Sequence, residues 1–465
     1  MADTYINPRR AEGDEPAAGL RAPTSRDRRA PALFVPGPFA PGQSLAGRRF
    51  LIVTAPFGPF GRTLAEQLTA EGAIVFRMVF NAGDAAYWRR SGGVTYTGDV
   101  RRWPQFLARL VQERRLTDVI VFGEGGPYNQ AVLSQAEKLK ALAANGAPQA
   151  AEAPRSANDG GASHPLRIWV LENGYFRPDW ITVEENGVNA SSGLPRHRGA
   201  YDPPIPEMLP TRPVGKILPY HVLNISLYHA AQPLGRLFFR RYVYPYTQSP
   251  WLQFAGHVRR YLSLALRSKR ESDAQVLRAR GPFFLACLQR EGDAQLLRYS
   301  HYADNTAFLA EVLSSFAKTA PADARLVIKN HPLDPGLVDL ARMTHVLAVE
   351  RGIADRVDFI DGGNLAALCR ASSGMVVNNS SAALSALGFS TPVKVLGAAF
   401  FDIDGLTDQQ PIDGFWTRPA APDDALFKRF KAHVISRTQV NGNYHEPRAI
   451  KHTARALARR FAAAR

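Results

Sequence analysis

The sequence has few of the features that mark disulfide-rich, metal-binding or membrane-spanning proteins. Only two of its 465 residues are cysteines, Cys287 and Cys369, and they stand far apart in the chain. This count excludes a disulfide framework, and no histidines stand at ligand spacing for a zinc site. There is no uninterrupted run of about 18 apolar residues and no basic-then-apolar signal at the N-terminus. We therefore expect a protein of a reducing cytoplasm that has no spanning helix.

Acidic residues are also in deficit. Lys and Arg number 57 against 41 Asp and Glu, which gives a formal net charge of +16. Such a surface attracts anions, including nucleic acids, anionic lipid headgroups and acidic metabolites. The aromatic and basic motifs of known nucleic-acid-binding modules do not occur, so we expect no nucleic-acid partner. The length and the 45% hydrophobic content allow two globular domains, each with its own core.

Two segments lack hydrophobic periodicity. Residues 1–47 are crowded with Pro, Ala, Gly and Arg, which predicts a disordered basic arm that carries no chemistry. Residues 142–165 are rich in Ala, Pro and Gly and predict a mobile surface insertion.

Elsewhere short β-rich runs alternate with helix-like stretches. Strands are predicted over 50–54, 74–80, 118–122, 167–171, 283–288, 325–329, 357–360, 374–378 and 393–396. Helices are predicted over 103–115, 130–145, 304–318, 335–350 and 381–388. This alternation predicts parallel sheets that are covered by helices on both faces.

The fold class that follows is α/β, with two Rossmann-like, doubly wound domains that face a cleft. Ligands of such sheets bind beyond the carboxyl ends of the strands. The boundaries that we predict are an N-terminal domain over 48–230, a helical bridge over 231–275, a second domain over 276–425 and a helical tail over 426–465.

The first candidate site residues follow the predicted strand at 325–329. Lys329, His331 and Pro332 stand at its carboxyl end, where an imidazole can point into a cleft and donate to a phosphate. Pro332 suits the first turn of a following helix, and the N-terminus of that helix would also favour an anion. The alternative is a surface turn with a capping role.

A second candidate is the run Asn378-Asn379-Ser380-Ser381, which joins a predicted strand to a predicted helix. It supplies amides, hydroxyls and free backbone N–H groups at one point, as a phosphate or carboxylate requires. Helix capping alone would account for one of the serines.

Carboxylates follow predicted strands in both domains. Gln289, Glu291 and Asp293 come after the strand at 283–288, and Glu172 comes at the end of the strand that begins at Arg167. Two carboxylates on facing walls can divide the nucleophile and acid/base roles of glycosyl transfer. The alternative for the Glu291 and Asp293 segment is an ordinary solvated loop.

Two weaker patterns point to turns. Gly58-Pro59-Phe60-Gly61 has neither the spacing of a dinucleotide fingerprint nor the Gly-Lys-Ser/Thr of a P-loop. Asp402-Ile403-Asp404 matches the short Asp-x-Asp pattern that holds a metal against a sugar-nucleotide diphosphate, but Gly405 favours a turn.

Several segments, taken in order, resemble the capsule polysaccharide biosynthesis and export family that contains the KpsS and LipB proteins. The resemblance runs from about residue 49 to 420. It rests on Asn81-Ala82-Gly83-Asp84 with Tyr87-Trp88, Leu171 to Tyr175, Trp180-Ile181-Thr182, Gly187-Val188-Asn189, Lys329 to Asp334, Asn379-Ser380-Ser381, Pro392 to Gly397, and Phe415-Trp416.

The resemblance implies a retaining β-Kdo transferase with two Rossmann-like domains of the GT-B-like kind. It would use CMP-β-Kdo to build a Kdo linker on a lysophosphatidylglycerol-type lipid, at the cytoplasmic face of the inner membrane, beside other capsule assembly and export proteins. By the same resemblance Asp293 would attack the anomeric carbon and Glu172 would assist. The cytidylate phosphate would be bound by Lys329, His331, Pro332, Asn379, Ser380 and Ser381, and the acceptor side of the cleft would be lined by Asn81, Asp84 and Gln289.

CMP has a single phosphate and needs no diphosphate clamp, so we expect no metal and no bound cofactor. Two alternatives stay open. One is a nucleotide-diphosphate-sugar glycosyltransferase in which Asp402 and Asp404 hold Mg²⁺. The other is a non-catalytic export or scaffold protein that binds acidic polysaccharide or lipid at the membrane.

Overall fold

The computed structural model describes residues 44–145, 165–207, 211–245, 249–266 and 272–464. The predicted arm, 1–47, and the predicted insertion, 142–165, lie outside the described residues except for 44–47, 142–145 and 165.

The first domain is built on a seven-stranded sheet of order β12-β6-β5-β4-β1-β2-β3. The five strands from β5 to β3 are parallel, and β6 runs antiparallel to both of its neighbours. The strands are β1 (Arg49–Ile52), β2 (Ile74–Val79), β3 (Gly93–Thr95), β4 (Asp118–Phe122), β5 (Arg167–Asn173), β6 (Trp180–Glu185) and β12 (Gln439–Asn441).

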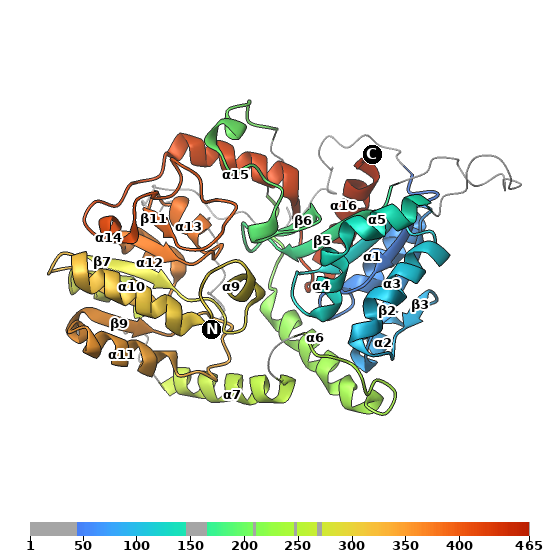
Figure 1. Ribbon diagram of the computed structural model, residues 1–465, viewed down its shortest axis with the longest axis horizontal. Coiled ribbons are helices and arrows are strands. Elements are labelled where there is room, and N and C mark those ends of the chain that lie inside the picture. Colours follow the sequence, from blue (N-terminus) through green and yellow to red (C-terminus); the bar gives the residue numbers. More distant parts are fainter. Residues whose placement is uncertain (1–43, 146–164, 208–210, 246–248, 267–271, 465) are drawn as a thin grey trace, which may run out of the picture.

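Helices cover both faces of this sheet (Figure 1). On one face α1 (Phe60–Ala70) packs against α16 (Pro447–Ala463), and the core there includes Phe50, Trp169 and Phe461. On the other face lie α3 (Trp103–Glu113), α4 (Pro127–Ser134) and α5 (Ala136–Asn145). The single helix predicted over 130–145 is therefore two, and α2 (Ala82–Trp88) follows β2.

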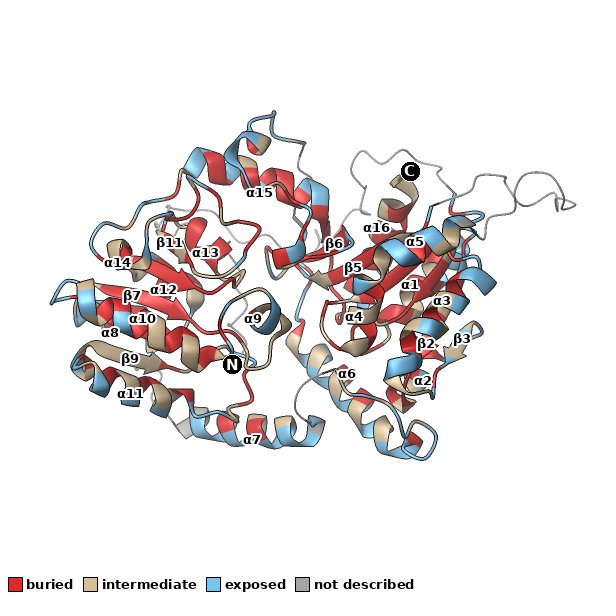
Figure 2. Ribbon diagram, in the orientation of Figure 1, coloured by how far each residue is buried: buried red, intermediate tan, exposed pale blue. Residues whose placement is uncertain are grey.

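The second domain has a five-stranded sheet of order β11-β10-β7-β8-β9 in which every pairing is parallel. Its strands are β7 (Phe283–Cys287), β8 (Arg325–Lys329), β9 (Val357–Ile360), β10 (Gly374–Val377) and β11 (Val393–Val395). One face carries α10 (Asn305–Thr319), α11 (Leu340–Glu350) and α14 (Ile412–Phe415), and the other carries α8 (Ala274–Ala279), α12 (Leu365–Ala371), α13 (Ala383–Leu387) and α15 (Asp424–Thr438). Two doubly wound domains are thus confirmed, and the central strands of both sheets are buried between their helices in Figure 2, whereas the edge strands β3 and β9 are not.

Before α6 (Leu218–Ala231), the segment after β6 already reaches the second core through Leu194 and Tyr201 and returns to the first domain, where Val214 and Ile217 pack on Ala449 of α16. From α6 onward the chain passes between the domains twice. The first passage runs from α6 and the short η5 (Gln232–Gly235), which pack on α2, to α7 (Pro250–Leu266) beneath the second domain. The second runs from α15, in the core of the second domain, directly into β12 and α16 of the first. The segment predicted as a helical tail is therefore shared between the two cores. The described residues also contain the 3-10 turns η2 (Val100–Arg102), η3 (Asn189–Ser191), η4 (Arg198–Tyr201) and η7 (Ala354–Arg356).

Both cysteines are buried and free. Within the described ranges no helix has the length and apolar content that crossing a membrane requires.

Candidate functional site

The centre of the second sheet is its topological switch point, where β7 and β10 lie side by side. The loops after these strands are tied together by the buried side chain of Gln289, which donates to Asn379 Oδ1 at 2.7 Å and accepts from Asn378 Nδ2 at 2.7 Å. Asn379 in turn donates to the backbone carbonyls of Gln295 and Tyr299. Gln289 and Asn379 therefore hold the short helix α9 (Ala294–Arg298) beside the carboxyl ends of β7 and β10.

Asp293 is the N-cap of α9. One carboxylate oxygen, Oδ1, accepts from the backbone N–H of Gln295 at 2.8 Å, while Oδ2 makes no hydrogen bond to any described residue. Burial raises the pKa of Asp293, and the charges of Arg290 and Arg177 oppose that rise. Asn305 Nδ2 donates to Glu291 Oε2 at 2.7 Å, so each carboxylate of this loop keeps one oxygen without a partner among the described residues. The charges that act on Glu291 come from Asp304 and Asp334 of the second domain, whereas the charge of Arg177, from the first domain, acts on Asp293. Asp293 is therefore the carboxylate of this loop that is influenced from across the domains.

The imidazole of His331 has a defined tautomer. Its Nδ1 accepts from the backbone N–H of Leu333 at 3.1 Å, so the proton of the neutral ring is on Nε2. Burial, together with the charges of Arg177 and Lys329, lowers the pKa of His331 to about 3. At neutral pH the ring is therefore an uncharged donor through Nε2–H.

The loop that carries His331 is held from the bridge. Arg260 of α7 is buried and donates to the backbone carbonyls of His331, Pro332 and Asp334, while its guanidinium pairs with Asp361. These bonds replace the helical turn that the sequence predicted at Pro332, and that prediction was wrong. The helix α11 begins only at Leu340.

Asp334, Pro335 and Gly336 explain why no helix begins at Pro332. The carboxylate of Asp334 accepts from the backbone N–H groups of Gly336 at 2.7 Å and Glu291 at 3.0 Å. Gly336 is left-handed, with φ +64°, and Pro335 precedes it. Together they set a loop that joins the carboxyl ends of β7 and β8.

Lys329 ends β8 and is only 5% exposed. Burial lowers its pKa, and no hydrogen bond or ion pair joins its ammonium group to another described residue. A buried cation that lacks a partner is costly, so this position is suited to an anionic ligand.

Ser380 and Ser381 are half-buried and stand just before α13, which begins at Ala383. The hydroxyl of Ser380 accepts from the backbone N–H of Ala382 at 3.3 Å. In the described part of the chain the hydroxyl of Ser381 has no partner.

The first domain contributes Glu172, the last residue but one of β5. Burial raises its pKa; the charge of Arg177 lowers it, and the charges of Asp293 and Glu124 raise it further. The charge of Asp293, from the second domain, therefore acts on Glu172.

Arg177 is the residue that the sequence reasoning missed. It follows β5, and its Nε donates to the carbonyl of Gly174 at 3.1 Å. Its charge acts on Glu172, Asp293 and His331. One exposed guanidinium of the first domain therefore influences candidate groups of both domains. No sequence pattern around Arg177 predicts this influence, because only the tertiary structure brings the end of β5 close to the second domain.

Glu124 was missed as well, although it follows β4 in the loop Gly123-Glu124-Gly125 and the strand-end rule could have found it. It is buried, accepts from Val188 N–H at 2.8 Å and from Gln295 Nε2 at 3.4 Å, and so connects the domains. It borders an interdomain cavity of about 280 Å³. The cavity is lined by Glu124, Gln130, Leu133, Ser134, Asn186, Ser191, Arg298 and Tyr299.

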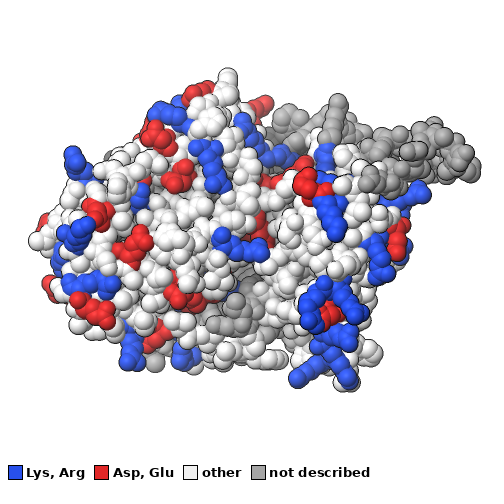
Figure 3. Space-filling view, viewed as in Figure 1, with Lys and Arg blue, Asp and Glu red and all other residues white. Residues whose placement is uncertain are grey.

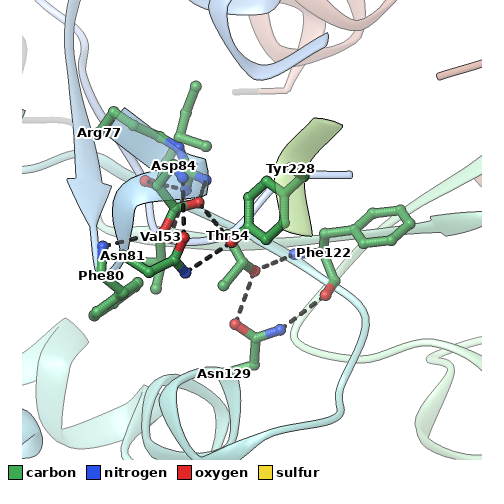
Figure 4. A network of polar contacts seen from close by, with 10 residues as sticks. Val53, Thr54, Arg77, Phe80, Asn81, Asp84, Phe122, Asn129 and Tyr228 are labelled. Atoms are coloured by element: carbon green, nitrogen blue, oxygen red, sulfur yellow. Dashed lines mark hydrogen bonds and ion pairs between the residues drawn. The ribbon is translucent and has the colours of Figure 1, made fainter. Parts of the chain in front are cut away.

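Asn81 and Asp84 belong to a separate network in the first domain (Figure 4). Asp84 pairs with Arg77 at 3.0 Å and accepts from Phe80 N–H, while Asn81 caps α2 and donates to Tyr228 of α6 at 2.8 Å. Gly83 allows this contact, because a Cβ there would stand 2.8 Å from the Tyr228 ring. Asp84 also lines a small pocket with Arg62 and Tyr87 at the end of the sheet.

The Asp-x-Asp pattern lies in a turn, as Gly405 with φ +83° indicates. Asp402 accepts from Thr407 Oγ1 at 2.6 Å and from Gln409, and Asp404 is exposed. Among the residues that the structure describes, no group of three or more His, Cys, Asp or Glu side chains could hold a metal ion.

These features define a protein of two Rossmann-like domains whose strand ends combine two half-buried carboxylates with donors for an anion. The sequence model of a family described as "Capsule polysaccharide biosynthesis protein" matches residues 148–445, which is more than half of the chain. The chain belongs to this family.

Two relatives are similar in sequence to this chain over nearly their whole length. The chain is 31% identical over 417 residues to the capsule polysaccharide modification protein LipB of Neisseria meningitidis serogroup A, covering 86% of this chain and 92% of that one. It is also 31% identical over 420 residues to the capsule polysaccharide export protein KpsS of Escherichia coli, covering 86% and 98%. Among solved structures, the β-Kdo 2,7-transferase of Thermosulfurimonas dismutans KpsC is similar at 14% identity and a TM-score of 0.37, covering 83% and 89%.

Proposed function

We propose that this protein is a glycosyltransferase of capsule biosynthesis that transfers β-Kdo from CMP-β-Kdo to a lysophosphatidylglycerol-type lipid with retention of configuration. The observation that carries the proposal is the set of donors at the strand ends of the second sheet, where buried Lys329 has no partner among the described residues and His331 offers a neutral Nε2–H. The positive charge of Arg177, an exposed side chain of the first domain, acts on the same region. Such a site suits a donor that combines a sugar carboxylate with a phosphate.

The phosphate of CMP would be bound at the strand ends of the second domain. Lys329 offers an ammonium group without a partner among the described residues, and His331 offers a neutral Nε2–H. Ser380 and Ser381 add hydroxyls beside the start of α13. Donors fixed in this way stabilise the charge that develops on the leaving phosphate, so we propose that the transfer needs no divalent metal.

In the first step the Asp293 carboxylate attacks the anomeric carbon of Kdo through Oδ2. The bond from that carbon to the phosphate oxygen breaks, and its electron pair leaves with CMP. Arg177 and Arg290 oppose the effect of burial on Asp293 and so favour the ionised carboxylate that this step requires.

In the second step an acceptor hydroxyl attacks the same carbon and displaces Asp293. Glu172, on the opposite wall, takes the proton of that hydroxyl. Burial raises the pKa of Glu172, which makes its ionised form a stronger base. Two successive displacements retain the anomeric configuration.

The reaction would take place at the cytoplasmic face of the inner membrane, where a lipid acceptor and a soluble nucleotide sugar can meet. The net charge of +16 favours an anionic leaflet and an anionic acceptor.

The test is transfer by the full-length protein from CMP-Kdo, generated in situ, to a fluorescent lysophosphatidylglycerol analogue, read by mass spectrometry with and without EDTA. We expect a mass gain of one or more Kdo units that survives EDTA, and its loss in Asp293→Ala and His331→Ala. Glu291→Gln is the matched control in the same loop and should keep activity. A gain that EDTA abolishes and Mg²⁺ restores would favour a metal-dependent diphosphate-sugar transferase, and binding without turnover would favour a scaffold.

A further inference from the structure

The helices of the first passage between the domains expose apolar side chains to solvent. On α7 the residues Trp251, Phe254, Val258 and Leu262 recur at spacings of three and four, which puts them in one stripe. All four are exposed, Trp251 and Leu262 by 63% each. A helix in a globular protein normally turns such a stripe inward, so α7 presents its apolar face the wrong way for a soluble surface.

The helix α6 and the turn that follows it repeat this arrangement. Tyr220, Leu223 and Leu227 form an exposed stripe on α6, and beyond it Leu234 is 84% exposed, beside exposed Leu237 and Phe238. Monomeric soluble proteins rarely leave a patch of this extent uncovered. We call the outer surface of α6, η5 and α7, with the residues 236–243 between them, the bridge face.

The inner sides of both helices are already occupied. Tyr228 of α6 bonds to Asn81, and Arg260 of α7 bonds to the carbonyl of His331. Neither helix can rotate its apolar stripe inward without breaking these buried contacts. The bridge face is therefore a fixed outward surface, and Figure 1 places both helices along the same edge of the molecule, one under each domain.

The charge of this segment points to the partner. Residues 208–270 contain no Asp or Glu. They contain ten basic residues: Arg212, Lys216, Arg236, Arg240, Arg241, Arg259, Arg260, Arg267, Lys269 and Arg270. Of these, Arg212, Lys216, Arg236, Arg240, Arg241 and Arg259 are described and exposed. Basic side chains gather around the lower end of α6 in Figure 3.

We infer that the bridge face docks on a bilayer that contains anionic phospholipid. Aromatic and aliphatic side chains on helices that also carry arginine are the composition of segments that lie in the membrane interface. An acid-free, basic and apolar surface complements anionic headgroups over an acyl layer. The binding stands independently of the transfer reaction. That it also brings the lipid acceptor to the cleft rests on the proposed function.

Flotation of the full-length protein with phosphatidylcholine vesicles, with and without phosphatidylglycerol, tests the inference. We expect binding that requires phosphatidylglycerol and weakens with salt. Leu237→Ser with Phe238→Ser, and Arg236→Glu with Arg240→Glu, should each weaken binding at least about tenfold. The matched controls are Val276→Ser on α8 and Arg109→Glu on α3, which are exposed elsewhere and should bind as the wild type does. Circular dichroism checks that each variant is folded.

Transfer to a short-chain acceptor in solution separates the two proposals. Variants that lose vesicle binding and keep this transfer would support the bridge face as a docking surface. Vesicle binding by the wild type without any transfer would support it too, while the proposed function would fail. Equal vesicle binding by the wild type and all variants would overturn it. So would dimerisation of the wild type that the Leu237 and Phe238 changes abolish, without vesicle binding, because a second copy would then cover the face.

Discussion

The guanidinium of Arg260 donates to the backbone carbonyl of His331 at 3.1 Å. The same side chain donates to the carbonyl of Pro332 at 3.0 Å and pairs with Asp361. Because Arg260 lies on α7, the candidate phosphate-binding histidine is positioned by a helix of the interdomain bridge and not by the strand that precedes it.

Arg260→Lys should lower kcat for transfer by about tenfold or more, since an ammonium group cannot reproduce the planar fork that holds three carbonyls and a carboxylate. The KM for CMP-Kdo should rise as well, because His331 is no longer fixed. Steady-state kinetics provide the measurement, with Arg109→Lys on the exposed side of α3 as the control. Wild-type kinetics in a folded Arg260→Lys protein would show that Arg260 does not position the site.

Arg177→Gln should move the acidic limb of the pH profile of kcat/KM to higher pH. Arg177 lowers the pKa of both Asp293 and Glu172, so its removal lets burial raise these values further. Asp293 and Glu172 would then ionise only at higher pH. Arg177→Lys keeps the positive charge and should shift the limb less. Identical limbs in all three proteins would contradict the electrostatic role of Arg177.

His445 should make the protein less stable in acid. Its pKa is lowered to about 3, mainly by burial, against 6.5 for an ordinary histidine. Below pH 6.5 the unfolded chain therefore binds a proton at His445, whereas the folded state does not. The contribution of neutral His445 to the free energy of unfolding is present above pH 6.5 and is lost as the pH falls.

The difference in free energy of unfolding between the wild type and His445→Phe should change by about 2 kcal/mol between pH 7 and pH 5, in favour of the variant at pH 5. Urea unfolding at the two pH values measures it, and His301→Gln on the exposed surface is the control. A difference that is independent of pH would show that His445 titrates normally.

Phe461→Ala should lower the free energy of unfolding by about 3–5 kcal/mol. Phe461 is fully buried and lies between Phe50 and Trp169, with ring centroids 5.6 and 4.8 Å away. Urea unfolding measures the loss, with Lys451→Ala on the exposed side of α16 as the control. An equal stability of both variants would mean that α16 is not part of the first core.

The sequence predicted the parallel strands well and the edges of the first sheet poorly. The buried runs such as Val119 to Val121 and Phe283 to Cys287 are hydrophobic enough to identify without knowledge of their partners. The strands β3 and β12 have three residues each, and such short segments are strands only because a neighbour is present. For the same reason nothing local predicts that α15 and α16 belong to different domains.

The candidate site was predictable where it follows strands. Asp293, Lys329, His331 and Ser380 do lie at carboxyl ends of the second sheet. Arg177 and Arg260 were not predictable, because their roles depend on contacts across domains and on a helix that has no motif. The predicted helix start at Pro332 was wrong for a local reason. The Asp334 carboxylate accepts from backbone N–H groups and stabilises a loop, so the helix begins only at Leu340.

The direct junction of Thr438 and Gln439 limits how far the two domains can separate. The helix α15 belongs to the second core and β12 pairs with β6 of the first sheet, with no residue between them. Near this junction Tyr201, which lies after β6, packs on Phe430 of α15. Pulling the domains apart at this side would therefore expose buried aromatic and aliphatic surface, so the two sheets are held together here by packing as well as by the covalent chain.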